Sequence, residues 1–234
     1  MSAKEIIDEL KTYASDERKK TNEWFFKTGK GGYSEYDRFM GVRVPHTRKV
    51  AKTHYKHTTL KTLDELLHHP IHEVRHCGLI ILVNQYQAGN QQTVFNYYLK
   101  NIHAVNNWDL VDTTTPQIIG DYIYNNQEKL DVLLNFSQSN DLWGKRIAIV
   151  ATFAFIKQGE FSPTLNIAKL LLDDSHDLIH KAVGWMLREI YKKNNEACKI
   201  FLRENYAQLP RTTLRYAIER MEENERLCYL KGKF

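Results

Sequence analysis

Four segments of the chain begin with a basic residue that is followed by small and apolar residues, and they recur at about 35 residues or twice that spacing. They are Arg75-His76-Cys77-Gly78, Lys145-Arg146-Ile147-Ala148, His180-Lys181-Ala182-Val183 and Arg215-Tyr216-Ala217-Ile218. A repeat of this length is typical of stacked helical hairpins, because each hairpin buries its apolar face only against its neighbours. The sequence therefore predicts an α-solenoid rather than a globular bundle.

Helical periodicity runs through nearly the whole sequence. Apolar residues recur at three and four positions, and the 234 residues include only 11 Gly and 5 Pro. We therefore expect an all-α chain, one domain of HEAT-like helical repeats over residues 1–234, with a concave groove lined by one helix of each pair. The expected helices span residues 3–13, 18–27, 45–57, 60–68, 71–87, 92–102, 106–114, 116–125, 129–138, 141–158, 163–172, 177–193, 196–204 and 211–222.

No segment predicts a membrane span or a secretory signal. The most apolar stretch, residues 147–156, is far shorter than the ~20 residues that a span requires. The first residues open an amphipathic helix without a signal-peptide core. The three cysteines stand far apart with no Cys-x-x-Cys pair, which is typical of structural thiols in a reducing compartment. We expect a cytoplasmic protein with no membrane contact.

The positive charge is unevenly distributed. The net charge is +5, yet the segment from Arg38 to Lys61 holds seven Lys and Arg and no Asp or Glu. Such a segment indicates a polyanionic partner. A basic helix face that is merely solvated is the alternative.

The predicted helix over residues 177–193 carries an aromatic residue on its polar side. Its apolar stripe consists of Ile179, Ala182, Val183, Met186 and Ile190. On the opposite face, Trp185 shares its side with Lys181, Arg188 and Lys192. This face indicates a nucleic-acid contact, in which cations hold phosphates and a ring packs on sugar or base. Packing of Trp185 on a neighbouring repeat is the alternative.

The predicted helix over residues 141–158 has a cation, Arg146, within its apolar stripe, where a charge needs a partner. The preceding repeat offers Trp108 and Asp112, which are four residues apart and share one helical face. A carboxylate beside an indole is either half of a structural salt bridge or an anion placed to meet a developing cation.

Two further patterns carry less weight. His68, His72 and His76 have helical ligand spacing, but Pro70 interrupts the helix and no carboxylate or Cys completes an obvious set. We expect no metal and no cofactor. The run Gly29-Lys30-Gly31-Gly32 lacks the Gly-Lys-Ser/Thr ending of a phosphate-binding loop, and we interpret it as a flexible basic loop.

Three motifs together resemble a known family. They are Trp108-Asp109-Leu110-Val111-Asp112 followed by Pro116 and Gly120-Asp121, then Leu142-Trp143-Gly144-Lys145-Arg146, and then Lys181-Ala182-Val183-Gly184-Trp185-Met186-Leu187-Arg188-Glu189. Their order and spacing are similar to those of the AlkD-type alkylpurine DNA glycosylases of the DNA alkylation repair family, which are built from HEAT-like repeats. The resemblance covers most of the chain.

The resemblance implies roles for individual residues. Asp112 matches the catalytic carboxylate, Trp108 and Trp185 match two aromatic walls, and Arg146 matches an arginine that holds a backbone phosphate beside the lesion. The segment Gly41-Val42-Arg43-Val44-Pro45, with Arg48 and Lys52, resembles the N-terminal part that grips the DNA backbone. The residues expected to bind DNA phosphates are Arg43, Arg48, Lys52, Lys181, Arg188 and Arg211.

The function implied is hydrolysis of the N-glycosidic bond of cationic N3- or N7-alkylated purines in duplex DNA, leaving an abasic site. We expect a monofunctional glycosylase that acts as a monomer. One alternative is a HEAT-repeat protein that binds DNA structures without catalysis. A protein-interaction scaffold is a third class, and it explains the repeats but neither the basic segment nor the face around Trp185.

Overall fold

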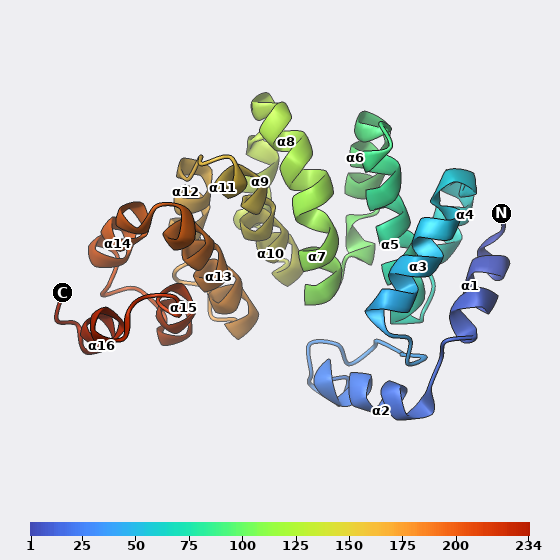
Figure 1. Ribbon diagram of the computed structural model, residues 1–234, viewed down its shortest axis with the longest axis horizontal. Coiled ribbons are helices and arrows are strands. Elements are labelled where there is room, and N and C mark those ends of the chain that lie inside the picture. Colours follow the sequence, from blue (N-terminus) through green and yellow to red (C-terminus); the bar gives the residue numbers. More distant parts are fainter. The chain divides into compact units, whose positions relative to one another are not determined.

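The computed structural model describes residues 1–234, and every extended regular element in it is a helix (Figure 1). The only strand-like feature is an isolated bridge between Arg38 and Ile71. The α-helices are α1 (Ala3–Lys11), α2 (Asp16–Phe25), α3 (Val44–His54), α4 (Leu60–Leu67), α5 (His72–Gln87), α6 (Gln91–Lys100), α7 (Trp108–Thr115), α8 (Asp121–Asn125), α9 (Asp131–Ser137), α10 (Leu142–Ala151), α11 (Phe153–Lys157), α12 (Ser162–Leu170), α13 (Asp177–Lys193), α14 (Asn195–Glu204), α15 (Arg211–Ala217) and α16 (Glu223–Lys231). The predicted all-α class is confirmed.

Two compact units make up the chain, residues 1–114 and residues 115–234. Each has its own apolar core, as expected for chains of this size. The sequence predicts that both units belong to one domain over residues 1–234, and this stays a prediction. None of the helices combines the length and the apolar character that crossing a bilayer requires.

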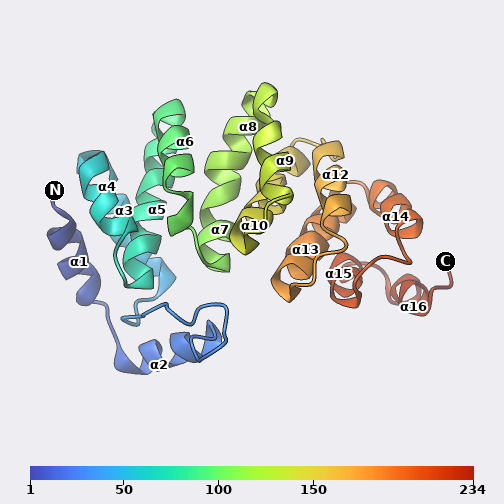
Figure 2. The same ribbon diagram turned by 180° about the vertical axis from the view of Figure 1, so that it is seen from behind.

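In the first unit, α5 is the central helix. It packs on α3, α4 and α6, and every one of its residues from His72 to Val83 is buried. Helix α2 buries none of its own residues and runs across the ends of α3 and α5 (Figures 1 and 2). Its entry is fixed by Ser15, whose hydroxyl accepts a hydrogen bond from the backbone N–H of Arg18.

In the second unit, α10, α13 and α15 pack in succession. These helices carry three of the four repeated segments, and α5 carries the fourth. Helix α13 lies close to α15 because residue 184 is glycine: a Cβ there would stand 2.5 Å from the Cβ of Tyr216 and 2.6 Å from the carbonyl oxygen of Thr213. Within the second unit, the repeated segments thus lie on helices that pack on one another.

Two of the expected helices are wrong in extent. The helix expected over residues 141–158 is divided at Thr152, whose hydroxyl donates to the carbonyl of Ile149 at 2.6 Å and competes with the helical ladder. The helix expected over residues 211–222 ends at Ala217, and α16 follows it. Helix α16 was not predicted because it buries only Tyr229 and so has almost no apolar stripe.

The boundary expected before Pro116 is also wrong. Thr115 has helical angles, φ −60° and ψ −47°, and forms no side-chain cap. The chain continues from α7 through a π-helical turn, η3 (Pro116–Gly120), into α8. Proline lacks an N–H and its ring crowds the preceding turn, so the helix widens at this point rather than ending.

Candidate active site

Trp108 and Asp112 lie one turn apart on α7, as their spacing predicts, and both side chains are half-buried. The indole N–H of Trp108 donates to the hydroxyl of Tyr33 at 3.2 Å. Its ring stacks on Phe26, with the centroids 5.3 Å apart, and meets the edge of Phe25 at 5.8 Å. Trp108 is therefore held in one orientation by residues of the N-terminal segment.

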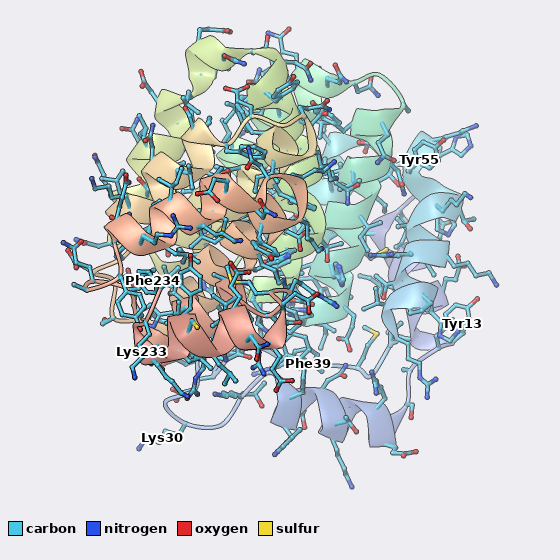
Figure 3. The ribbon with its side chains drawn as sticks, turned by 60° about the vertical axis from the view of Figure 1, so that its left-hand side comes forward. Tyr13, Lys30, Phe39, Tyr55, Lys233 and Phe234 are labelled. Carbon is cyan, nitrogen blue, oxygen red and sulfur yellow. The ribbon has the colours of Figure 1, made fainter.

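The loop over residues 29–40 fastens the start of α7. Asn107 is fully buried, and its amide donates to the hydroxyl of Ser34 at 2.6 Å and to a carboxylate oxygen of Asp37 at 2.7 Å. The side-chain oxygen of Asn107 accepts the first backbone N–H of α7 at 2.8 Å. The flexible basic loop expected over residues 29–32 precedes these contacts and stays a prediction, and its Lys30 points away from the fold (Figure 3).

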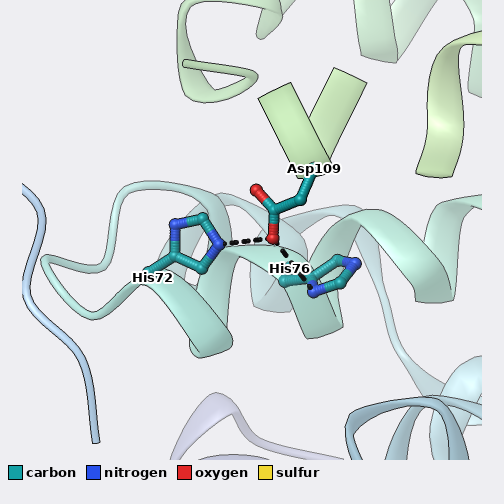
Figure 4. A group of neighbouring side chains, drawn as sticks. All are labelled: His72, His76 and Asp109. Carbon is teal, nitrogen blue, oxygen red and sulfur yellow. Dashed lines mark hydrogen bonds and ion pairs between the residues drawn. The ribbon is translucent and has the colours of Figure 1, made fainter. Parts of the chain in front are cut away.

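A buried ionic network joins this loop to α5 and α7. His72 lies between two carboxylates, with Nδ1 3.3 Å from Asp37 and Nε2 2.8 Å from Asp109 (Figure 4). Arg75 donates to Asp37 as well. Burial lowers the pKa of His72, but the charges and hydrogen bonds of Asp109 and Asp37 outweigh burial and raise it to about 9. His72 is therefore a buried cation at neutral pH.

Asp37 shows the opposite balance. Burial alone raises the pKa of its carboxyl, yet the hydrogen bond from His72 and the charge of Arg75 lower it to about 2. Burial raises the pKa of the Asp109 carboxyl, but the charge and hydrogen bond of His72, together with the backbone N–H of Leu110, lower it below its usual range. Both carboxylates are ionised at neutral pH, and the network is a set of paired charges.

His76 lies one turn after His72 on α5 and is a third titratable group beside Asp109. Its Nδ1 is 4.0 Å from Asp109, and burial lowers its pKa to about 4, so the ring is neutral. This carboxylate could not be matched to the histidines from local sequence, because Asp109 lies 37 residues after His72 on another helix. His68 does not join them, since its Nε2 lies 3.2 Å from Nε2 of His103.

Glu73 ties the segment before α3 to α5. Its carboxylate accepts the backbone N–H groups of Met40, Gly41 and Val42 at 3.1, 2.9 and 3.2 Å. Gly41 has φ +85°, and a Cβ there would lie 2.1 Å from the carbonyl oxygen of Ser15. This arrangement sets the position from which α3 begins.

Three exposed cations lie at α3: Arg43 directly precedes the helix, and Arg48 and Lys52 lie within it. Arg48 and Lys52 are four residues apart and share one face of the helix. None of the three forms an ion pair within the protein. They are available to an external anion, as the sequence predicts for the acid-free segment.

Arg146 in the second unit is only 5% exposed, on α10. Its Nη1 donates to the carbonyl oxygen of Leu178, in the first turn of α13, at 2.6 Å. The sequence required a partner for a cation inside an apolar stripe, and a backbone carbonyl is one such partner. The charge of Arg146 inside an apolar stripe indicated that a partner is needed. Only the fold shows that the carbonyl of Leu178 accepts from it.

Trp185 is half-buried on α13, and its indole N–H donates to the carboxylate of Glu189 at 3.2 Å. Its ring lies 6.0 Å from that of Phe153. The three cations beside it all have acidic partners: Lys181 pairs with Asp177 at 2.7 Å, Lys192 with Glu189 at 2.7 Å, and Arg188 with Glu219.

The three cations that the sequence places around Trp185 are therefore each paired with a carboxylate. Asp177 and Glu189 stand within four residues of their partners, so helical spacing could have revealed them. Glu219 comes from beyond α15, and no local pattern marks it. Arg211 begins α15 and donates to the carbonyl of Leu230 at 3.2 Å while remaining exposed.

Comparison with known proteins now adds to this geometry. The profile of the family described as "DNA alkylation repair enzyme" matches residues 6–221, which is nearly the whole chain. The chain belongs to the DNA alkylation repair enzyme family. The resemblance found in the three motifs is thereby confirmed, and the family gives the protein a role as an enzyme in the repair of alkylated DNA.

One solved structure is similar along almost its full length. It is described as "Predicted DNA alkylation repair enzyme from Enterococcus faecalis" and superposes with a TM-score of 0.73 at 15% identity. The match covers 90% of this chain and 97% of that one. At this identity the likeness concerns the fold, and it agrees with an α-solenoid of helical repeats. None of the curated proteins matches the chain in sequence.

Proposed function

We propose that this member of the DNA alkylation repair enzyme family is a monofunctional DNA glycosylase. It hydrolyses the N-glycosidic bond of cationic N3- or N7-alkylated purines in duplex DNA and leaves an abasic site. The observation that carries the proposal is the pairing of Trp108 with Asp112 on one face of α7, within the matched residues 6–221. An indole beside a half-buried carboxylate suits a reaction that develops positive charge on a sugar.

The chemistry explains why one carboxylate suffices. An N3- or N7-alkylated purine is positively charged and leaves without protonation, and the transition state places oxocarbenium-like charge on the deoxyribose. The Asp112 carboxylate stabilises that charge and positions the attacking water, while Trp108 holds the sugar by ring contact. No lysine acts as the nucleophile, so water attacks the anomeric carbon of the deoxyribose and the product is an abasic site.

Trp108 is well suited to this role because its orientation is set in advance. Its hydrogen bond to Tyr33 and its stacking on Phe26 fix the ring, and Asn107 fixes the helix start on which the ring stands. A group held in place before the substrate arrives loses little conformational entropy in the reaction.

The partner in this proposal is double-stranded DNA, bound by a monomer without a cofactor. Arg43, Arg48 and Lys52 bind backbone phosphates, with additional phosphate contacts from Lys181, Arg188 and Arg211. The family motifs assign Arg146 to a phosphate beside the lesion and Trp185 to a second aromatic contact with the sugar.

The test is release of free alkylated bases from randomly methylated duplex DNA at low salt. We expect release by the wild type and a loss of at least about 100-fold in Asp112→Asn, because the developing charge then lacks its anion. Asp131→Asn, an exposed carboxylate on α9, is the matched control and keeps full release. Release by Asp112→Asn at the wild-type rate would refute the catalytic assignment.

The competing function is DNA binding without catalysis. Tight, salt-dependent duplex binding by the wild type with no release of any methylated base would select it. In that case Trp108 would be a groove contact rather than part of a catalytic pair.

A further inference from the structure

We propose that His72, His76 and Asp109, three residues to which the proposed repair reaction assigns no role, form a binding site for one zinc ion. Each residue offers one ligand atom, and these atoms all lie within 4.8 Å of one another (Figure 4). All three lie in the first unit, two on α5 and one on α7. Two imidazoles and one carboxylate are a donor set that zinc takes readily.

The spacing of the two histidines is the first support. His72 and His76 are four residues apart within the run His72-Glu73-Val74-Arg75-His76. On a helix this His-Glu-x-x-His pattern places both rings on one face, where they hold a single zinc ion. The run lies inside α5, after Pro70, so the proline does not interrupt it.

The groups around His72 form the support that a metal-binding imidazole requires. Its Nδ1 lies 3.3 Å from a carboxylate oxygen of Asp37, and its Nε2 points at Asp109. A carboxylate on one ring nitrogen fixes the orientation of the ring, and the ion takes the place of the proton that Nε2 of the His72 cation carries when no metal is bound. Asp37 is itself held by Arg75 and Asn107.

His76 supplies an independent observation. The residue is 2% exposed, its Nε2 has no hydrogen-bond partner, and its Nδ1 is 4.0 Å from Asp109, beyond hydrogen-bond distance. Burying a polar ring without partners is costly. A metal ion between Nδ1 and Asp109 bridges the 4.0 Å gap and ties this buried ring to the carboxylate, while Nε2 stays unbonded. An ion pair of His72 with Asp109 alone leaves His76 unexplained.

Two of the three distances between ligand atoms require only small adjustments, and the third, between the two histidines and within 4.8 Å, would narrow by up to about 1.5 Å. Zinc bonds of about 2.0–2.2 Å in a tetrahedron place neighbouring ligand atoms roughly 3.3–3.6 Å apart. The gap of 2.8 Å between His72 and Asp109 would widen and that of 4.0 Å between Asp109 and His76 would narrow, each by about half an ångström. All three residues line a cavity of about 380 Å³, which leaves room for water as the fourth ligand.

The surroundings also indicate what the ion does. In peptidases with this histidine pattern the glutamate is a general base, but Glu73 here accepts three backbone N–H groups and is already used. The ion therefore joins α5 to α7 at the residue next to Trp108. Its role is to fix the start of α7, and not to hydrolyse a peptide.

The experiment uses the full chain after chelator treatment, titrated with Zn²⁺ and separately with Co²⁺. We expect one Zn²⁺ per chain by calorimetry and visible absorption typical of four-coordinate Co²⁺ with N and O ligands. His76→Leu is expected to fold, because it removes an unpartnered polar ring, and to lose at least about 100-fold in zinc affinity. Circular dichroism of this variant verifies the fold.

The matched control removes the other histidine pair of this unit. His68→Ala with His103→Ala deletes two exposed rings whose Nε2 atoms are 3.2 Å apart, and it is expected to leave zinc binding unchanged. Absence of stoichiometric binding by the wild type would overturn the proposal and leave an ion pair only. Unchanged binding by His76→Leu, or loss of binding by the control, would overturn it as well.

Discussion

The basic segment of α3 and the basic face of α13 differ in how their charges are balanced. Arg43, Arg48 and Lys52 are exposed and form no ion pair. On α13, Lys181 and Arg188 are each paired with a carboxylate, from Asp177 and Glu219. In sequence the two regions look alike, because each presents a row of Lys and Arg on one side of a helix.

This difference decides which cations contribute to binding a polyanion. A free surface cation that contacts a phosphate releases a condensed counterion, whereas a paired cation must first give up its internal partner. We therefore expect the first unit to supply most of the electrostatic affinity for DNA. The cations around Trp185 form ion pairs within the protein, so we expect each of them to contribute less to phosphate binding.

The largest predicted effect belongs to the free cations. The triple variant Arg43→Ala, Arg48→Ala, Lys52→Ala should bind duplex DNA about 100-fold more weakly at low salt, because three charge-assisted contacts are lost. The slope of log affinity against log salt should fall by about 2.7, which is about 0.9 for each phosphate. Fluorescence anisotropy over a salt series measures both quantities.

A matched variant separates specific contacts from net charge. Lys4→Ala, Lys231→Ala, Lys233→Ala removes the same charge from exposed positions at the two ends of the chain. It should leave the salt slope nearly unchanged. If it weakens binding as much as the α3 variant does, the affinity reflects net charge and the comparison between the two regions fails.

A smaller effect is expected at the paired cation on α13. Arg188→Ala should weaken DNA binding by less than about threefold, because the arginine is engaged with Glu219. Glu219→Gln should strengthen binding by a similar factor and raise the salt slope by about one, because it frees that arginine. Equal losses for Arg188→Ala and for single substitutions on α3 would contradict the assignment of Arg188 as a mainly structural cation.

The two units should also differ in how their stability depends on pH. The pKa of His72 is raised to about 9, so its contribution is complete below its unfolded value near 6.5 and is lost as pH rises through 9. The pKa of Asp37 is lowered to about 2, so its contribution is present above about 3.9 and is lost as pH falls through 2.

Hydrogen exchange measured in chelator at pH 6 and pH 9 tests the alkaline side. Protection of α5 and α7 should fall by about 1–3 kcal/mol between these values, while α13 and α15 change less. His72→Gln should remove most of this difference between the units. A uniform loss of protection across both units would show that His72 does not control the stability of the first one.

The fold was largely predictable because local patterns determine it. Apolar residues at helical spacing predicted most helices, and the repeated basic segments mark α5, α10, α13 and α15. Helix α16 was not predicted, because a helix that buries only one side chain has no apolar stripe in its sequence. The π-helical turn at Pro116 was not predicted, because proline usually marks the boundary of a helix.

The candidate site was predictable only where one helix carries it. Trp108 and Asp112 follow from spacing within α7, but the partners that orient Trp108, from Tyr33 to Phe26, lie some 75 to 82 residues earlier in the chain. Asp109 meets His72 only because the fold brings the start of α7 next to the start of α5. Pairings of this kind depend on which helices meet, and that information is absent from local sequence.

The central claim is that Asp112 performs the chemistry and the free cations of α3 hold the DNA. Its most direct test is to measure base release and duplex affinity in parallel for the wild type, Asp112→Asn and the Arg43, Arg48, Lys52 triple variant. We predict that Asp112→Asn binds like the wild type and releases almost no alkylated purine. The triple variant should bind weakly but release bases at nearly the wild-type rate once saturated. A wild type that binds duplex DNA and releases no alkylated base would contradict the account.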